Sequence, residues 1–519
     1  MSNSSNRGQK RPAAKDGSNP KTKRSGASPP PSTPRSATPP PPQTTHPLSL
    51  LSILVLACAK AFIPGKDDAF FARREQWRRQ LDRDDLLVGS KEFVEIFARG
   101  EALYLHNSET AQHIQVHDDG TNYEKKIGNF DGIHLFKKKT DLGLVVPDLT
   151  PANLKNYLDV NKYVKVIGSN DQNEYSLKIK DLLDRLEDDT IYRDQPYNLI
   201  SMECTKDQYK LHKQITVPTF VSESAIIQKL ESLLRDEYFA IREKKSSAHP
   251  IATYLNTKMK NMPRYQKFLL LSMKNSFTGV HVDPAATSVY YHVLHGKKVF
   301  YVCPPTKKNL EIYKYFERRP DQSKWVGDIL FDGWQRIEIN AGETAMIPAG
   351  WIHFVFTPED SIVIGGNFLT EQSMEMQFEI ARLEEELLKT KPEIKSNTFQ
   401  GFRNIMWMYL ERILIPAVRY AHGHGGLSET LKARALLFQK EMNPLQHGTG
   451  HSWKSTSGRH DLLEELGAAM GEPLANTRPQ VMSHPLPVHD APVRRSSRIK
   501  DAENRVVKEE SEEEEDEDF

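Results

Sequence analysis

The spacing of apolar residues changes in the centre of the chain. Between residues 265 and 369, short runs rich in β-branched and aromatic residues are separated by Gly342, Pro348, Gly350 and Pro358. Runs of this kind predict strands. We expect strands at 267–273, 288–294, 298–303, 336–339, 344–347, 353–357 and 361–368, with a turn at His295-Gly296 between the second and the third. Short strands in such number predict a closed β-sandwich or barrel.

Apolar residues at helical spacing occur on both sides of this centre. Residues 68–104 are expected to be helical, and residues 223–243 place Ile227, Leu230, Leu233 and Leu234 on one side. Residues 371–389 have apolar positions at alternating steps of four and three, which is typical of a packing face, and 404–415 predict another helix. Residues 125–215 mix helix with short strands, for example at 143–146 and 163–167.

Composition indicates that both ends of the chain lack a core. Apolar residues make up 38% of the 519 residues, against about 45–50% in a wholly globular chain. Residues 1–46 are rich in Pro, Ser, Thr, Lys and Arg, and residues 421–519 end in an acidic run at 509–518. Such segments bury too little apolar surface to offset their ordering entropy, so we predict disorder. The net charge of +1 therefore averages a basic head and an acidic tail.

Two N-terminal features have alternative interpretations. The basic clusters Lys10-Arg11 and Lys21, Lys23 and Arg24 resemble a bipartite nuclear import signal, and a solvated tail in contact with nucleic acid is the alternative. The apolar run at 47–63 contains Lys60 and is shorter than the ~20 residues of a membrane span. Because it follows a long polar segment, it does not resemble a signal peptide, and we expect a helix packed on the folded body.

Cysteine and histidine positions limit the metal chemistry. The three cysteines are isolated in sequence, which excludes a disulfide framework and a CxxC zinc finger and favours an intracellular protein; they are Cys58, Cys204 and Cys303. Residues 420–491 are rich in His, Gly, Ser and Pro. The irregular spacing of their histidines predicts a loop rather than a metal site; these are His422, His424, His447 and His451.

His281-Val282-Asp283 is the sharpest local motif. In a strand, residues i and i+2 point to the same face, so the imidazole and the carboxylate would project together. His353 follows the turn Pro348-Ala349-Gly350 and enters a later strand. It would complete the 2-His-1-carboxylate set of a non-haem Fe(II) site. A chance HxD and a histidine satisfied in the core are the alternatives.

Lys298 and Thr278 strengthen this interpretation. Lys298 opens an apolar strand, where burial of a lysine is costly unless it is paired, so it could meet an anionic ligand. Thr278 lies three residues before His281, where its hydroxyl could donate to a carboxylate. A snorkelling lysine and a threonine placed by β propensity are the alternatives.

Three longer segments resemble a known family. TGVHVD (278–283), TSVYYHVLHGKKVFYVCPPT (287–306) and IPAGWIHFVFTPEDSIVIGGNFL (347–369) resemble the JmjC histone lysine demethylases, most nearly the JmjC histone demethylation protein 1 type, with the PHD-finger demethylases as near neighbours. The resemblance is strong over about 265–415. It continues more weakly back to about 130, through DLGLVVPDLT (141–150) and YNLISMECT (197–205). One departure is Pro284-Ala285-Ala286, where the family usually has Phe-Gly-Gly, and this change could alter substrate fit or activity.

The resemblance implies a double-stranded β-helix that binds Fe(II) and 2-oxoglutarate. It implies three iron ligands, His281, Asp283 and His353. It further implies that the distal carboxylate of 2-oxoglutarate is held by Thr278 and Lys298. Beside the cofactor and the methyl-lysine pocket it places Asn198 and Tyr291.

The implied activity is demethylation of a histone lysine, most nearly lysine 36 of histone H3 in its di- and monomethyl states. Hydroxylation of the N-methyl group would release formaldehyde and succinate, in a nuclear chromatin regulator that acts on transcription. The implied partners are the histone H3 tail and the nucleosome; weak DNA contact through the basic tail stays open, and neither a membrane nor a zinc-finger module is expected. Two alternatives remain, a catalytically inactive JmjC chromatin-binding factor and a protein hydroxylase on the same fold.

Together these features predict an α+β chain, built around a jelly-roll or cupin-like JmjC barrel with flanking helices and disordered termini. We expect a disordered basic tail at 1–46, a helical and mixed pre-barrel region at 47–215 and the catalytic barrel with its leading helix at 216–370. A C-terminal helical region at 371–420 and a mostly disordered segment at 421–519 complete the prediction.

Overall fold

The computed structural model of the chain describes residues 90–98, 113–123, 128–188, 193, 195–204, 210–244, 249–319, 327, 330, 334–445 and 454–471. All of them belong to the unit that spans residues 65–519. The predicted basic tail, the apolar run at 47–63, most of 68–104 and the acidic end lie outside the described residues. Within 68–104, helix α3 (Lys91–Ala98) is described.

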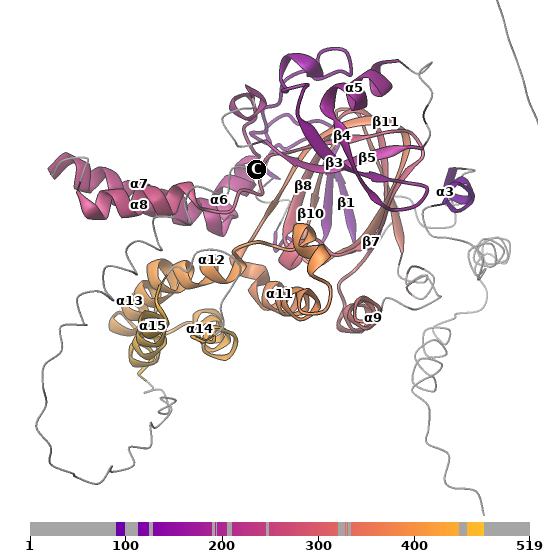
Figure 1. The fold of residues 1–519 in the computed structure, drawn as a ribbon. Helices are drawn as coiled ribbons and strands as arrows, with labels where there is room; N and C mark the ends of the chain where they lie inside the picture. The colour runs from indigo at the N-terminus through magenta and orange to yellow at the C-terminus, as the bar shows by residue number, and fades with distance from the viewer. Residues whose placement is uncertain are drawn as a thin grey trace, which may run out of the picture. The chain divides into compact units, whose positions relative to one another are not determined.

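Two long antiparallel strands form the centre of the fold. β8 (Ser288–Cys303) and β11 (Ile352–Phe368) pair along most of their length. β8 pairs with β10 (Thr344–Ile347) through its first half and with β9 (Gln335–Asn340) through its second half. β11 pairs with β7 (Ser276–His281) through its first half and with β6 (Phe268–Ser272) through its second half. Each long strand thus changes its outer partner along its length, as in a double-stranded β-helix, and the strands belong to one 11-stranded sheet (Figure 1).

The prediction of separate strands on either side of His295-Gly296, and on either side of Pro358, is wrong. Both pairs of runs are continuous strands that bend. Gly296 has φ +72°, and an added Cβ would lie 2.0 Å from the carbonyl oxygen of Asp360, so glycine lets the two bends pack closely. Pro358 falls where the register shifts between Phe356 and Glu359, and a proline is tolerated at such an irregularity because its missing N–H is not needed for pairing.

Further strands extend this sheet at both edges. β2 (Ile133–Phe136) pairs with β10 and, in parallel, with β1 (Ile114–His117). β5 (Tyr197–Glu203) pairs with β6, and β3 (Tyr163–Gly168) and β4 (Glu174–Lys178) follow it in the sheet. The strand predicted at 163–167 is therefore confirmed, whereas 143–146 contains only an isolated bridge to Thr216.

Helices precede and follow the barrel. α5 (Ile179–Glu187), α6 (Thr219–Ser224), α7 (Ile226–Lys244) and α8 (Pro250–Lys260) come before it, and α7 packs on α8 (Figure 1). α9 (Lys307–Glu317) connects β8 towards β9. α11 (Met374–Leu388) follows β11 as predicted and buries its apolar face. In place of one helix at 404–415 there are α12 (Phe402–Tyr409), a π-helical turn (Leu410–Leu414) and α13 (Ile415–Gly423).

The prediction of a loop over 420–491 is wrong for two segments. α14 (Glu429–Glu441) and α15 (Thr456–Ala469) each begin after a serine, Ser428 or Ser455, whose side chain accepts a hydrogen bond from a first-turn N–H. Phe438 of α14 is fully buried in the helical core. Each helix has only a short apolar face, so the polar composition of residues 420–491 does not reveal it. No described helix combines the length and the apolarity that crossing a membrane requires.

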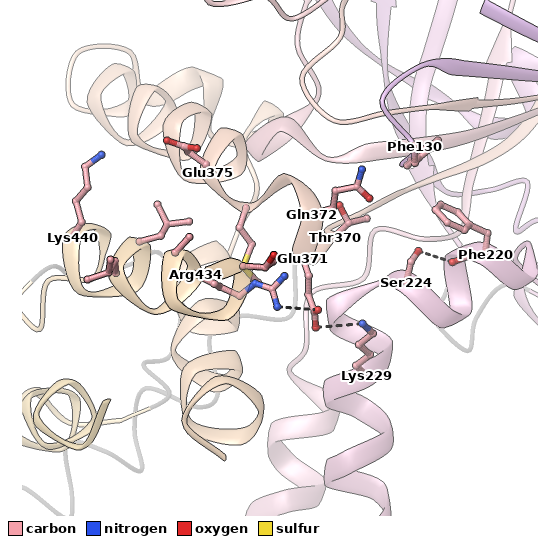
Figure 2. A pocket seen from close by; sticks show the side chains of 15 residues that line it. Phe130, Phe220, Ser224, Lys229, Thr370, Glu371, Gln372, Glu375, Arg434 and Lys440 are labelled. Atoms are coloured by element: carbon pink, nitrogen blue, oxygen red, sulfur yellow. Dashed lines mark hydrogen bonds and ion pairs between the residues drawn. The ribbon is translucent and has the colours of Figure 1, made fainter. Parts of the chain in front are cut away.

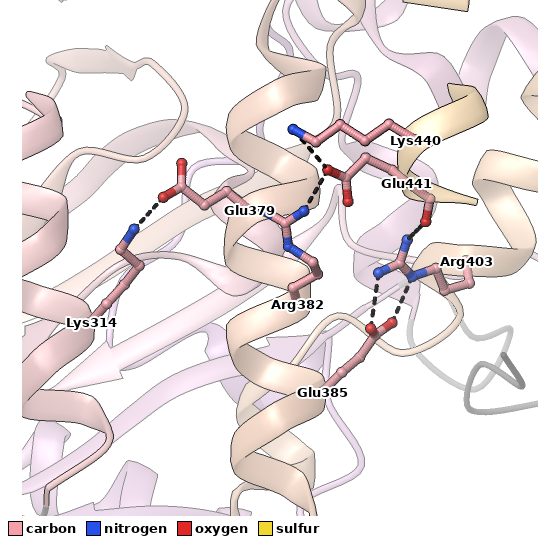
Figure 3. Close-up of polar contacts among 7 residues, drawn as sticks. All are labelled: Lys314, Glu379, Arg382, Glu385, Arg403, Lys440 and Glu441. Atoms are coloured by element: carbon pink, nitrogen blue, oxygen red, sulfur yellow. Dashed lines mark hydrogen bonds and ion pairs between the residues drawn. The ribbon is translucent and has the colours of Figure 1, made fainter. Parts of the chain in front are cut away.

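Charged side chains join the helices that follow the barrel (Figure 3). Buried Arg403 donates two hydrogen bonds to the Glu385 carboxylate, at 2.7 and 2.9 Å, and one to the carbonyl oxygen of Glu441, at 2.9 Å. Arg382 pairs with the Glu441 carboxylate. α11 is therefore bound to both α12 and α14.

Candidate metal centre

Two neighbouring strands bring His353 to the HxD motif. β7 ends at His281, and β11 places His353 opposite it in the antiparallel register. Their ring centroids are 4.1 Å apart. Val282 is buried, while Asp283 directs its Oδ2 to 3.9 Å from His353 Nε2. One potential ligand atom from each of the three residues lies within 4.8 Å of the others, which is the arrangement that a facial triad requires.

Backbone carbonyls orient both imidazoles. Nδ1 of His281 lies 2.8 Å from the carbonyl oxygen of Gly279, and Nδ1 of His353 lies 3.0 Å from that of Trp351. A proton on each Nδ1 donates to these carbonyls and leaves Nε2 free to bind a metal. Burial, followed by the nearby His281, lowers the pKa of His353 to about 4, so its neutral form predominates at physiological pH.

Lys298 lies inside the barrel without a charged partner among the described residues. Only 2% of its surface is exposed, so the snorkelling alternative is wrong. Its Nζ donates to Ser272 Oγ at 2.5 Å and to Thr357 Oγ1 at 2.9 Å. Desolvation lowers the pKa of Lys298 to about 7. An anionic ligand would restore its charge, so the position is suited to hold a carboxylate.

A chain of hydrogen bonds links Lys298 to Thr278. Ser272 Oγ, which accepts from Lys298, donates to Asn198 Oδ1 at 2.7 Å. Asn198 Nδ2 donates to Thr278 Oγ1 at 2.9 Å. The four residues come from β8, β6, β5 and β7, so correct strand register is needed to form the chain. Since Thr278 accepts in this chain, its own hydroxyl proton is left to donate to a ligand.

One cavity of about 670 Å³ is lined by every site residue that the sequence indicated, namely Asn198, Thr278, His281, Asp283, Tyr291, Lys298 and His353. Tyr291 packs edge to face against Phe300, with centroids 4.9 Å apart. Burial raises the pKa of Tyr291 far above its ordinary value, so it remains a neutral phenol. The cavity therefore combines polar groups with an apolar wall.

Other residues of the site could not be found from the HxD motif. Ser272 and Thr357 position Lys298, and the signal that could have found them is a buried polar residue in an otherwise apolar strand. Glu317 of α9 and Glu384 of α11 also line the cavity. Burial raises the pKa of both carboxyl groups, that of Glu384 to about 7. Tertiary packing alone brings these helical residues to the site.

The donor set fits Fe(II) and 2-oxoglutarate. Two imidazoles and one carboxylate suit non-haem Fe(II) and leave coordination positions open. Lys298 and the hydroxyl of Thr278 lie in the same cavity and can hold a carboxylate. The volume of about 670 Å³ falls in the usual range for small-molecule sites.

A second cavity, of about 810 Å³, lies among α7, α11 and α14 (Figure 2). Glu371 lines it and accepts hydrogen bonds from Lys229 at 3.3 Å and Arg434 at 3.1 Å (Figure 2). These charges compensate one another, and none of the seven site residues reaches this cavity. It is therefore separate from the candidate metal centre.

Comparison with known proteins finds relatives that are named as lysine demethylases or histone demethylation proteins. The chain is 28% identical over 384 residues to lysine-specific demethylase 2A of Xenopus tropicalis, covering 73% of this chain and 30% of that protein. It is 30% identical over 312 residues to JmjC domain-containing histone demethylation protein 1 of Saccharomyces cerevisiae, covering 57% and 58%. A protein of the same name from Emericella nidulans is 40% identical over 161 residues, covering 30% and 11%. The chain thus spans less than two thirds of each of these relatives.

A family model described as JmjC domain, hydroxylase matches residues 268–368. This range begins with β6 and ends with β11, so it coincides with the double-stranded β-helix and contains His281, Asp283 and His353. The resemblance found in the sequence is therefore confirmed for the domain. The chain therefore contains a JmjC domain at residues 268–368, and it is similar over 73% of its length to a protein named lysine-specific demethylase 2A.

Proposed function

We propose that this chain is an Fe(II)- and 2-oxoglutarate-dependent histone lysine demethylase that acts on di- and monomethylated lysine 36 of histone H3. The observation that carries the proposal is the convergence of the His281, Asp283 and His353 ligand atoms within 4.8 Å, in a cavity that also contains Lys298. The names of the relatives, lysine-specific demethylase and histone demethylation protein, support the same reaction class.

Each part of the site has a role in this proposal. His281, Asp283 and His353 would hold the iron, and Lys298 with Thr278 would hold the distal carboxylate of 2-oxoglutarate. With O₂, the bound groups supply the oxidising power for hydroxylation of a methyl C–H bond. The carbonyl oxygens of Gly279 and Trp351 orient the two imidazoles, and Ser272 and Thr357 orient Lys298. The apolar wall of the cavity limits the access of water. The hydroxylated methyl group leaves as formaldehyde.

The wall of the cavity favours a substrate with a cationic side chain. Glu317 lines the cavity, and Lys391 donates a hydrogen bond to its backbone carbonyl. A carboxylate at the wall favours the approach of a lysine ammonium group through complementary charge. Phe300 and Val355 supply apolar contact for the methylene chain of the same lysine.

The proposed partners are the histone H3 tail and the nucleosome, and the proposed location is the nucleus. Relatives named JmjC domain-containing histone demethylation protein 1 support a histone substrate. The basic clusters from Lys10 to Arg24 would serve import and weak contact with DNA. They lie outside the described residues, so this part of the proposal rests on sequence.

A catalytically inactive chromatin-binding factor is the second candidate, because Pro284-Ala285-Ala286 replaces the usual Phe-Gly-Gly. Ala285 and Ala286 have φ values of 47° and 49°, in the left-handed region that glycine adopts without strain. The turn thus keeps a backbone suited to glycine, and Asp283 remains beside the two histidines. This geometry favours the active enzyme.

A peptide panel tests the proposal. Purified protein is incubated with Fe(II), 2-oxoglutarate and histone H3 peptides methylated at lysine 36 or at other lysines, followed by mass spectrometry and formaldehyde detection. We expect loss of one CH₂ group per cycle from di- and monomethyl lysine 36, and no loss with His281→Ala. Gain of one oxygen atom would identify a hydroxylase instead. Binding of peptides without any mass change would identify an inactive factor.

A further inference from the structure

We propose that Glu384 is a positioning residue for the metal-binding carboxylate of Asp283, because it holds the strained turn that directly follows this ligand. The inference rests on the proposed metal site. It concerns a helix after the barrel, outside the range that matches the JmjC model, and therefore extends the functional unit beyond residues 268–368.

The turn after Asp283 stores backbone strain. Ala285 has φ 47° and ψ 35°, and Ala286 has φ 49°. In this left-handed region the Cβ of an L-residue lies too close to a backbone oxygen, so two consecutive alanines are held there at a cost. Both alanines are fully buried, and Ala286 N–H donates to the carbonyl oxygen of Asp283 itself, at 2.8 Å. A relaxation of the turn would therefore move the backbone of the ligand.

Glu384 supplies the contact that the turn cannot make internally. The N–H groups of Ala286 and Thr287 are satisfied within the turn, by Asp283 and Pro284. Ala285 N–H instead donates to Glu384 Oε1 at 2.5 Å. The second oxygen of Glu384 accepts from the N–H of Phe399 at 3.1 Å. One buried carboxylate thus joins the turn to the segment that follows α11.

A second helix fixes the other side of Asp283. Val282 N–H donates to the hydroxyl of Tyr313, from α9, at 3.3 Å. Lys314 of the same helix pairs with Glu379 of α11 (Figure 3). The backbone on each side of Asp283 is therefore held by a side chain from a different helix, and an ion pair joins the two helices.

Positioning explains the contacts of Glu384 better than a direct chemical role. Both of its carboxylate oxygens already accept backbone N–H groups, so neither is directed to a metal. Within the described part of the chain, the cluster of potential metal ligands consists of His281, Asp283 and His353 and does not include Glu384. A glutamine at this position would keep the size but replace one acceptor with an amino group, which cannot accept from a backbone N–H.

Metal binding by the ligand-free full chain tests the role of Glu384. Mn(II) serves as a redox-stable probe, and its dissociation constant is measured by calorimetry for the wild type, Glu384→Gln and Glu385→Gln. Glu385 is the adjacent residue on α11 and pairs with Arg403, so its variant controls for a general loss of stability. We expect the Mn(II) dissociation constant to rise about 10- to 100-fold in Glu384→Gln, as for other partners of metal ligands, and to stay unchanged in Glu385→Gln.

Glycine at the strained positions should restore the Mn(II) affinity of Glu384→Gln. If Glu384 only stabilised the fold, these glycines would not restore it. In Ala285→Gly/Ala286→Gly/Glu384→Gln the turn needs less restraint, and we expect most of the Mn(II) affinity to return. If Glu384→Gln does not fold, Glu384→Asp, which is one methylene too short, should show the same loss and the same rescue. Wild-type affinity in Glu384→Gln, or an equal loss in Glu385→Gln, would overturn the inference. Wild-type protein that binds Mn(II) but demethylates no peptide would overturn the proposed function alone.

Discussion

Lys298→Met should stabilise the ligand-free protein while weakening its affinity for 2-oxoglutarate. Burial lowers the pKa of Lys298 from 10.5 to about 7. At about 1.4 kcal/mol per pH unit, this difference corresponds to about 5 kcal/mol against the charged amine in the folded state, as an upper bound. Methionine has a similar length and no charge, so it removes this penalty.

Lost hydrogen bonds offset part of the gain. Thr357 loses the donor that reaches its hydroxyl, while Ser272 keeps its bond to Asn198. A buried polar group left unsatisfied costs about 1–3 kcal/mol. We therefore expect the free energy of unfolding of the ligand-free variant to rise by about 2 kcal/mol. The substitution has the opposite effect on the complex with 2-oxoglutarate. Loss of one partner from a buried charge pair costs about 2–5 kcal/mol, which raises the dissociation constant of 2-oxoglutarate at least about 30-fold.

Two measurements separate these effects. Chemical denaturation without ligand gives the stability, and calorimetric titration of 2-oxoglutarate in the presence of Mn(II) gives the affinity. Lys297→Met is the matched control, because the adjacent Lys297 lies beside Glu338 at 3.8 Å and is partly exposed; we expect little change in either quantity. A Lys298→Met variant that is less stable than wild type and binds 2-oxoglutarate normally would refute the reasoning.

Three further predictions concern the pKa of Lys298, the hydrogen-bond chain through Asn198 and the ion pair of Arg403. Between about pH 7 and 10.5 the unfolded chain retains the Lys298 proton that the folded chain has released, so the free energy of unfolding of the ligand-free protein should rise with pH across this window. The affinity for 2-oxoglutarate should fall about tenfold per pH unit above pH ~7, because the charged amine becomes scarcer. Denaturation and calorimetry at several pH values check the two directions. Asn198→Ala removes the link between Ser272 and Thr278 and should raise the 2-oxoglutarate dissociation constant about tenfold without changing Mn(II) affinity, as measured by titration of each ligand. Arg403→Met removes the ion pair with the partly buried Glu385 and should lower the free energy of unfolding by about 1–3 kcal/mol, measured by denaturation. An unchanged value would show that the ion pair contributes nothing net.

Local patterns predicted most of the strands and placed His281 next to Asp283, because both depend on near neighbours in sequence. The two-residue period of a strand places His281 and Asp283 on one face, and a lysine within an apolar run marks Lys298. Ser272 and Thr357 were missed because they meet Lys298 only through the register of three strands. The continuity of β8 and β11 was missed for a similar reason, since a glycine or proline that ends an isolated strand can also bend a paired one.

α11 combines a packing face with a side chain that contacts the turn after Asp283. Its spacing predicts a packing face, and Ile380, Leu383 and Leu387 are indeed buried. The same helix places Glu384 beside the turn after Asp283, where it accepts a hydrogen bond from the N–H of Ala285. From the sequence, two alanines in place of Gly-Gly would be expected to disturb the turn beside the metal ligands. An alanine can nevertheless occupy a left-handed position when its surroundings restrain it. The restraint comes from residues after the barrel, so the consequence of this departure can be judged only with α11 in place.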